Sequence, residues 1–415
     1  MARIDLCHYI IGPSVFCARG LVSIMRDFSN NDFFVDPDIR RAESLPDSAF
    51  TDPDFLELEM ETIFNKTWMF VPHHGSPSRS AVFSEIPNKP GSRVPFALLG
   101  KPLFLQMNSR REINCFPNVC THAWHPLVES ASIGGSIVCP QHGREFDSEG
   151  RFMSHKGFEK LEDFPRESDS LRKLPLENWG PLISVCLGEP LAPFRKIMEN
   201  VKQSIPGIDL ESFRYKPVAN EIREVDGNWK QHAWNYVDNY HIRFVHKGPE
   251  GLADAIDLET YTTELYQHGA IQWAYARRPE DGFDPQQVAT RFKDPNNDDK
   301  RVFALWWFIF PNLTMNFYPW GLSVNQYLPV PGRPERTQFH WFQYSLDEAK
   351  FNQRNKVWLN QQVDTEDIEA ISLVSKGARS GFAPRGRFAP REEQGPHWLH
   401  RLIYATVFQE SRPRD

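Results

Sequence analysis

The sequence predicts an α+β protein built from two unequal parts. From Thr67 to about Gly188, short apolar runs alternate with Gly, Pro and Asn, a texture typical of a small antiparallel β domain. Beyond residue 190, helical apolar stripes flank a group of strand-like runs, and a long helical segment follows them. At 415 residues the chain is too long for one simple core, so up to three domains are expected.

Composition narrows the class of protein. Hydrophobic residues make up 40% and aromatic residues 13% of the chain, enough for a well-filled interior. A formal net charge of −7 argues against a nucleic-acid-binding surface. Six cysteines are few for this length and do not form the disulfide framework of a secreted protein, which favours a reducing, cytoplasmic compartment. No run of 18 apolar residues occurs, so we expect no membrane span.

The first residues differ in character from the rest. Residues 1–25 are poor in acids and carry scattered arginines, and Gly12-Pro13 breaks the apolar run that a signal peptide needs. We therefore expect residues 1–35 to form a poorly ordered extension, with an organelle transit peptide as the alternative. Residues 36–66 predict a lead-in helix that packs on the larger domain, because Asp52 offers a cap and apolar residues follow at roughly helical spacing.

Four apolar runs beyond residue 300 predict neighbouring antiparallel strands. The first is continuously apolar, which predicts cover on both faces, and the others alternate apolar with polar residues. A long helix is expected from about Asp347 to Lys376, and residues 397–404 predict an amphipathic closing helix. The four runs are 302–310, 313–318, 322–329 and 337–344.

Two cysteine–histidine pairs lie inside the β domain, sixteen residues apart: Cys120-Thr-His122 and Cys139-Pro-Gln-His142. Four such ligands can hold a structural zinc. Each pair, however, offers one thiolate and one imidazole, so both thiolates can bind one iron and both imidazoles a second. That is the ligand set of a Rieske [2Fe-2S] cluster, in which neutral imidazoles raise the reduction potential.

A second candidate metal site lies between Asn228 and His246. Asp238, His241 and His246 fall within nine residues, and two imidazoles with a carboxylate are typical ligands of non-haem iron. We expect a helix capped by Asn228, with Asp238 and His241 on one face. His246 lies about 140° further round a regular helix, so it can join the same metal only where the helix ends, which Lys247-Gly-Pro predicts.

These motifs resemble the oxygenase alpha component of the Rieske non-haem iron oxygenases. The Cys-x-His and Cys-x-x-His pairs are followed by Gly143, Phe146 and Asp147 as in that family, and Asn228-Trp-Lys with Asn-Tyr-x-Asp-x-Tyr-His matches its iron motif. The resemblance implies a Rieske domain over 67–189 and a helix-grip catalytic domain over 190–415. It also implies that the four cysteines and histidines of the pairs bind the cluster.

Further roles are implied by the same resemblance. His241, His246 and Asp367 are implied as ligands of a mononuclear Fe(II), with Asp364, one helical turn before Asp367, as the alternative third ligand. Asp238 is implied as a bridging carboxylate between a cluster histidine and an iron-bound one. Asn235 is implied as a second catalytic residue.

The chain also departs from the family at two places in the cluster loops. Ala123-Trp124 stands where an Arg-Gly pair is common, and Arg144 where a tryptophan is common. Neither position supplies a ligand, so the departures bear on loop packing and reduction potential rather than on the type of cluster.

A mononuclear iron with open positions can activate O2 but needs electrons one at a time, which a Rieske cluster can deliver. The chain has neither a dinucleotide-binding glycine fingerprint nor plant-type ferredoxin cysteine spacing. We therefore expect NAD(P)H to act only through a separate reductase, of the flavin or ferredoxin type. The resemblance implies a homotrimer in which one subunit's cluster serves its neighbour's iron.

The substrate is the least constrained feature. The segments after Asn228 resemble the family's choline monooxygenase-like branch, which acts on quaternary ammonium compounds, so hydroxylation or N-demethylation of such a cation is expected. The alternative is an aromatic-ring hydroxylase or O-demethylase, with Arg243 contacting an acidic substrate. A non-catalytic electron carrier is disfavoured by the long segment beyond the cluster domain. Aromatic candidates for binding a cation are Trp273, Tyr275, Trp306, Trp307, Phe317 and Trp320.

Overall fold

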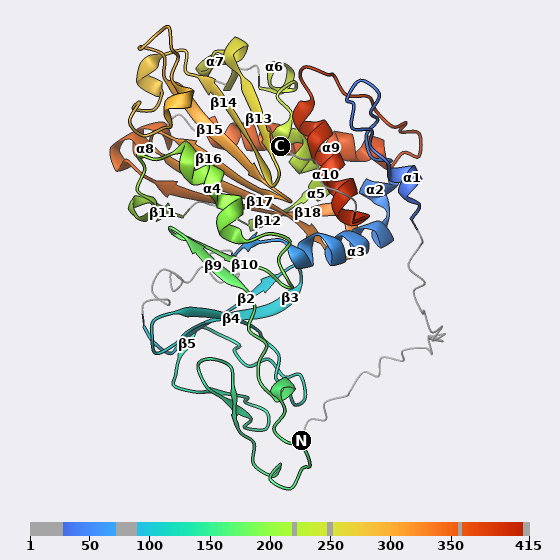
Figure 1. The fold of residues 1–415 in the computed structure, drawn as a ribbon, viewed down its shortest axis with the longest axis vertical. Helices are drawn as coiled ribbons and strands as arrows, with labels where there is room; N and C mark the ends of the chain where they lie inside the picture. The colour runs from blue at the N-terminus through green and yellow to red at the C-terminus, as the bar shows by residue number, and fades with distance from the viewer. Residues whose placement is uncertain (1–27, 72–88, 218–221, 247–251, 356–358, 410–415) are drawn as a thin grey trace, which may run out of the picture.

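The computed structural model describes residues 28–71, 89–217, 222–246, 252–355 and 359–409. Three small sheets lie at one end of the molecule, and a large sheet with most of the helices forms the other end (Figure 1). The α+β class predicted from the sequence is confirmed. Residues 1–27 lie outside the described residues, but residues 28–35 do not form the poorly ordered extension that was expected, because Phe33 and Val35 are buried in the core.

The small part consists of short antiparallel strands. One sheet has the order β4-β3-β2-β5, another β6-β7-β8, and the third β1-β10-β9. Because β1 pairs with β10, the two ends of this part of the chain meet in one sheet. The strands are β1 (Met69–Phe70), β2 (Ser92–Leu98), β3 (Lys101–Met107), β4 (Ile113–Pro117), β5 (Ser132–Ile133), β6 (Ile137–Val138), β7 (Glu145–Phe146), β8 (Phe152–Ser154), β9 (Leu176–Trp179) and β10 (Leu182–Val185).

The large part is built on an antiparallel sheet of order β11-β18-β17-β16-β15-β14-β13, with β12 also pairing with β18. The four predicted strands beyond residue 300 are confirmed as β15 to β18, and β15 is buried along its whole length, as its unbroken apolar run predicted. The strands are β11 (Arg214–Lys216), β12 (Ile222–Asp226), β13 (Thr262–Tyr266), β14 (Gly269–Tyr275), β15 (Val302–Ile309), β16 (Leu313–Tyr318), β17 (Gly321–Val330) and β18 (Arg333–Ser345).

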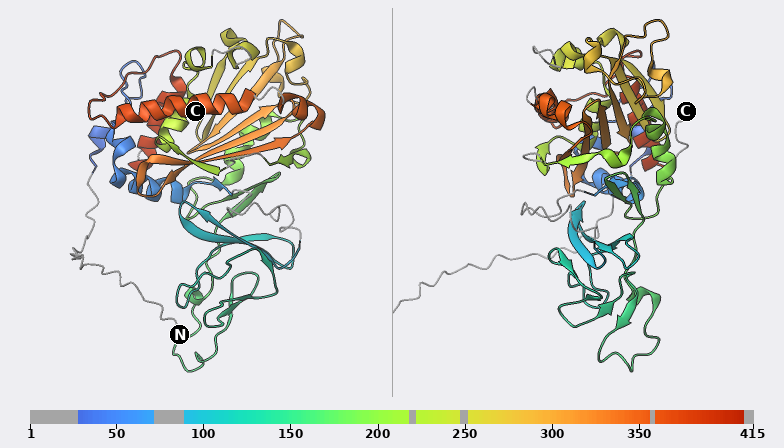
Figure 2. Two further views of the ribbon diagram at one scale, coloured as in Figure 1. Left: turned by 180° about the vertical axis from the view of Figure 1, so that it is seen from behind. Right: turned by 90° about the vertical axis from the view of Figure 1, so that its left-hand side faces the viewer.

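Helices cover both faces of this sheet. Figure 2 shows α9 lying across one face, and α5 contacts both α9 and α10. The helices are α1 (Asn30–Phe33), α2 (Ser48–Thr51), α3 (Pro53–Thr62), α4 (Phe194–Ser204), α5 (Trp229–Val237), α6 (Ile242–Val245), α7 (Leu252–Ala255), α8 (Glu348–Asn355), α9 (Leu359–Ala378) and α10 (Gln394–Val407).

The structure bears on two helix predictions. The long helix expected from about Asp347 to Lys376 corresponds to α8 up to Asn355 and to α9 from Leu359 onward, and residues 356–358 between them lie outside the described residues. Phe351 of α8 is buried in a mainly aromatic cluster that is separate from the other core clusters. The closing helix α10 is longer than expected and is buried on nearly every face rather than amphipathic, because it packs against α3, α5 and β13.

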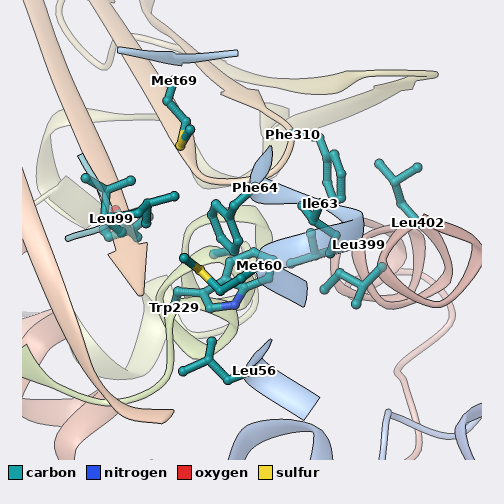
Figure 3. Close-up of a cluster of buried hydrophobic side chains, with 14 of the residues drawn as sticks. Leu56, Met60, Ile63, Phe64, Met69, Leu99, Trp229, Phe310, Leu399 and Leu402 are labelled. Carbon is teal, nitrogen blue, oxygen red and sulfur yellow. The ribbon is translucent and has the colours of Figure 1, made fainter. Parts of the chain in front are cut away.

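The lead-in helix α3 packs into the main core. Asp52 caps it by accepting a hydrogen bond from the Asp54 amide at 2.9 Å, as the sequence predicted. Figure 3 shows side chains of α3 and the residues just after it gathered around Trp229 of α5. Removing one such buried side chain typically costs about 2–5 kcal/mol. The core therefore ties the lead-in segment to the helix that precedes the histidine site.

Candidate metal centres

The two cysteine–histidine loops are tight turns held by backbone hydrogen bonds. Cys120 and Cys139 are buried in the same small core, where Cys139 acts on the thiol of Cys120. Burial raises the pKa of the Cys120 thiol. The rings of His122 and His142 lie 4.9 Å apart. The thiols thus pair with each other and the imidazoles with each other, as a cluster with one iron for each pair requires.

A single zinc ion fits these loops poorly. Among the described residues, a group of ligand atoms within 4.8 Å of one another is found at His241, His246 and Asp367, but not at the two loops. Tetrahedral zinc needs four ligand atoms around one centre. The geometry therefore favours the two-iron cluster over the zinc alternative.

Arg144 packs against these loops through several side-chain contacts. It is buried, pairs with Asp169 at 2.9 Å, and donates to Thr121 Oγ1 at 2.9 Å. Its Nε also donates to His155 Nδ1 at 3.1 Å, and the His155 ring lies 4.7 Å from His122. A charged guanidinium thus fills the place where the family commonly has a tryptophan. Arg144 stands out in the sequence, whereas Asp169 and His155 do not, because no local motif gives a signal for them.

The histidine site begins where α5 ends. Asn228 caps α5 as predicted, with its side chain accepting from the Lys230 amide at 3.0 Å. The helix stops at Val237, so the prediction that it would carry Asp238 and His241 is wrong. The Asp238 side chain accepts a hydrogen bond from the Tyr240 amide at 2.7 Å, and such a side-chain bond competes with helix continuation.

This break lets both histidines converge on one point. His241 precedes the short helix α6 and His246 ends it. Their Nε2 atoms lie 3.2 Å apart. Asp367 Oδ1, from α9, lies 3.0 Å from His246 Nε2 and 3.5 Å from His241 Nε2. Asp364, the alternative ligand, is not part of this group.

A carboxylate also stands behind each imidazole. Asp238 Oδ2 lies 3.4 Å from His241 Nδ1, and Glu366 Oε2 lies 2.7 Å from His246 Nδ1. Carboxylates in this position orient metal-binding histidines and strengthen them as ligands. Glu366 directly precedes Asp367 in the sequence, but its role was not predicted because it depends on a contact 120 residues distant.

The electrostatics favour positive charge at the point of convergence. Burial opposes protonation of His241, but the nearby carboxylates of Asp238 and Asp367 outweigh it and raise its pKa to about 9. Burial also opposes ionisation of Asp367, yet His241 and His246 hold its pKa below the usual range. Burial, together with the charge of Asp367, raises the pKa of Asp364 to about 7. Asp367 Oδ1 is buried without a hydrogen-bond partner among the described residues, as expected of an atom kept for a metal.

A cavity of about 80 Å³ adjoins the three converging side chains. Of the six aromatic candidates only Trp306 lines it, and the rest are corrected to other positions in the fold. The sequence analysis missed the tyrosines because they come from α5, β16, β17 and the segment before β13. Arg243 is half exposed and pairs with Glu259 at 3.1 Å, outside the cavity. The aromatic residues lining the cavity are Tyr236, Tyr261, Trp306, Tyr318 and Tyr327.

A larger groove of about 580 Å³ is lined by Asn235 and Asp238, which also line the small cavity. Its other walls are largely apolar and come from α2, α5, α9 and the segment after α9. Asp238 therefore stands between the candidate metal site and an open groove.

Comparison with known proteins identifies the class. The Rieske [2Fe-2S] domain family matches residues 80–165, and the ring hydroxylating alpha subunit (catalytic domain) family matches residues 211–407. The chain belongs to the Rieske non-haem iron oxygenases, as an oxygenase alpha component. It is accordingly an oxidoreductase that uses a Rieske cluster, a mononuclear iron and O2, receives electrons from a reductase and acts on a small molecule.

Two relatives are similar to this chain over most of their length. The chain is 23% identical over 384 residues to the carnitine monooxygenase oxygenase subunit of Acinetobacter pittii, covering 90% of this chain and 95% of that protein. It is 27% identical over 412 residues to the chloroplastic choline monooxygenase of Arabidopsis thaliana, covering 95% and 88%.

Solved structures share the fold. A quaternary ammonium Rieske monooxygenase superposes with a TM-score of 0.71 at 20% identity, covering 92% of this chain and 99% of that one. Naphthalene 1,2-dioxygenase with indole bound gives a TM-score of 0.65 at 17% identity, covering 91% and 94%. Separately, none of the described helices is both long and apolar enough to span a bilayer.

Proposed function

We propose that this oxygenase component oxidises a quaternary ammonium compound by hydroxylation or N-demethylation. The observation that carries the proposal is the cavity beside His241, His246 and Asp367, whose wall contains five tyrosine and tryptophan rings. Aromatic faces attract quaternary ammonium groups through their π-electrons. The carnitine and choline monooxygenases among the relatives support the same class of substrate.

The residues present fit the implied metal centres. His241, His246 and Asp367 would hold the mononuclear iron, because two imidazole nitrogens and one carboxylate oxygen converge there. Cys120, His122, Cys139 and His142 would hold the cluster. When bound, the iron supplies oxygen activation and the cluster supplies single electrons. The chain's own part is to hold the substrate against this site: the rings exclude water, and Glu366 keeps His246 oriented by its 2.7 Å contact.

Asp238 is proposed as the bridge between the centres, with Asn235 beside it. Asp238 faces His241 on one side and the larger groove on the other. The groove's apolar walls suit the cluster end of a second copy of the chain, where Trp124 is 82% exposed. This supports the homotrimer implied by the family. Asp238→Asn should keep both metal centres yet slow single-turnover electron transfer, and unchanged kinetics would contradict the bridge.

Three further assignments belong to the proposal. The pairing of Met69 with Val185 supports a Rieske domain over 67–189 and a catalytic domain over 190–415, with 36–66 as lead-in. The reductase is proposed to be of the flavin or ferredoxin type. Among the described residues, the cysteines at 115, 120, 139 and 186 form no disulfide, which supports a reducing, cytoplasmic location.

The deciding experiment is a substrate screen with purified holoenzyme and a surrogate reductase. Choline, glycine betaine and carnitine are compared with aromatic acids, and coupled oxygen uptake and product are measured. We expect uptake and product with at least one quaternary ammonium compound. Product from aromatic acids alone would overturn the proposal in favour of ring hydroxylation, the alternative that naphthalene dioxygenase supports only at the level of the family.

A further inference from the structure

A carboxylate without an assigned role lines the same cavity. Asp364 lies one turn before Asp367 on α9, and its Oδ2 is buried with no hydrogen-bond partner among the described residues. Burying a carboxylate oxygen without a partner is unfavourable, so such an atom calls for an explanation. Because Asp364 stays outside the group formed by His241, His246 and Asp367, binding the metal does not provide one.

On the cavity side, the described neighbours of Asp364 include tyrosines, whereas the charges that act on it come from Arg223, outside the cavity lining, and from His246 and Asp367 of the metal-binding group. The charge of Asp364 reaches the hydroxyl groups of Tyr318 and Tyr327, whose pKa values are raised chiefly by burial and further by Asp364. No lysine or arginine is found among the described residues that line the cavity. Arg223, on β12, also acts on Asp364 but does not line the cavity, so it does not take the place of a ligand there.

A cavity with aromatic walls and an acid that lies outside the metal-binding group is complementary to a cation. The rings can surround the methyl groups of an ammonium, and a buried carboxylate attracts its charge strongly in a medium that excludes water. A substrate carboxylate would instead lie close to Asp364 and Asp367 and meet no lysine or arginine among the described lining residues.

We propose that Asp364 is a specificity-determining residue that pairs with the substrate's ammonium group and selects a net cation, of the choline type, over a zwitterion that carries its own carboxylate. This inference rests on the proposed function and deepens it, because it separates two classes of quaternary ammonium substrate. Asp364 is assigned contact with the substrate and no part in holding the metal.

The test is equilibrium binding to the iron-loaded holoenzyme under anaerobic conditions, measured by calorimetry. The probes are choline, its uncharged carbon isostere 3,3-dimethylbutan-1-ol, and glycine betaine. Wild-type protein should bind choline at least about tenfold more tightly than either other probe. Asp364→Asn should lose about tenfold in affinity for choline and leave the isostere unaffected. Glu369→Gln, an exposed position on the same helix, is the matched control and should change neither affinity.

The outcomes separate this inference from the proposed function. If wild-type protein binds and oxidises quaternary ammonium compounds but Asp364→Asn binds choline equally well, the role of Asp364 is refuted and the proposed function stands. A wild-type preference for betaine over choline, or equal affinity for choline and its isostere, also refutes it, without relying on any variant. If wild-type protein neither binds nor oxidises any ammonium compound, both fail. Iron content and the cluster spectrum of Asp364→Asn should match wild type.

Discussion

The ion pair between Glu59 and Lys230 should be among the most costly interactions to break. Glu59 comes from α3 and Lys230 from α5, and Nζ lies 2.7 Å from Oε2 with both side chains fully buried. Trp229 Nε1 donates to the same oxygen at 3.0 Å. The pair therefore links the lead-in helix α3 to α5, which ends just before Asp238 and the candidate iron site.

Replacing Glu59 by leucine leaves the ammonium of Lys230 buried with no anionic partner. Breaking a buried pair from one side typically costs about 3–5 kcal/mol, a large part of the roughly 5–15 kcal/mol that stabilises a native protein. Burial already lowers the pKa of Lys230, so the stranded amine can lose its proton, which keeps the cost within that range. Lys230→Met should cost a similar amount by stranding Glu59.

The double variant Glu59→Leu/Lys230→Met should recover most of the loss, because two apolar side chains replace two opposite charges. Urea unfolding of the four proteins gives the coupling energy, which we expect to be at least about 4 kcal/mol, because the double variant should lose far less than the two single losses together. Arg110→Met, at an exposed pair with Glu112, is the control and should leave stability nearly unchanged because water screens that pair. If the double variant loses the sum of the single losses, the reasoning is refuted.

Three other predictions concern the metal sites and the pH response. Asp367→Ala should lose mononuclear iron and turnover while keeping the cluster spectrum, whereas Asp364→Ala should retain iron, as metal analysis will show. Arg144→Gln should lower the reduction potential of the cluster, because it removes a buried positive charge near His122. Arg144→Lys should preserve most of that potential. Redox titration followed by electron paramagnetic resonance measures both potentials. Burial lowers the pKa of His340 to about 3 from an ordinary value of 6.5. Between these pH values His340 is protonated in the unfolded chain and neutral in the folded chain. The contribution of His340 to the free energy of unfolding is therefore fully present above pH 6.5 and falls by about 1.4 kcal/mol per pH unit as the pH drops toward 3. His340→Phe should remove this pH dependence, as measured by urea unfolding at a series of pH values.

Each of these has an outcome that would contradict it. Loss of iron from Asp364→Ala with retention in Asp367→Ala would exchange the two assignments. An unchanged potential in Arg144→Gln, with the cluster intact, would show that the buried charge does not act on the cluster. Parallel pH profiles for wild type and His340→Phe would mean that this histidine titrates alike in both states.

Short-range spacing determined much of what could be read from the sequence. Cys120, His122, Cys139 and His142 sit in two tight turns, where ligand direction depends on a few neighbouring residues. The strands from β15 to β18 were predictable for a similar reason, since their apolar residues recur at strand spacing, although the polar residues between them in β16 and β17 are buried too. The end of α5 was not predictable in this way, because it depends on the hydrogen bond that the Tyr240 backbone amide donates to the Asp238 side chain.

The tertiary structure decided which distant residues meet. Asp367 and Asp364 lie one helical turn apart and look alike in sequence, yet the packing of α9 against α5 brings Asp367 to the imidazoles and leaves Asp364 on the cavity wall. The tyrosines of the cavity come from separate elements whose alignment depends on strand register. Neither Glu366 behind His246 nor Asp169 beside Arg144 has a local signal. The sequence alone therefore determined the family and the candidate cysteine and histidine ligands. The fold decided which aspartate joins the histidines and gave the substrate cavity its shape and charge, because those depend on contacts between residues far apart in the chain.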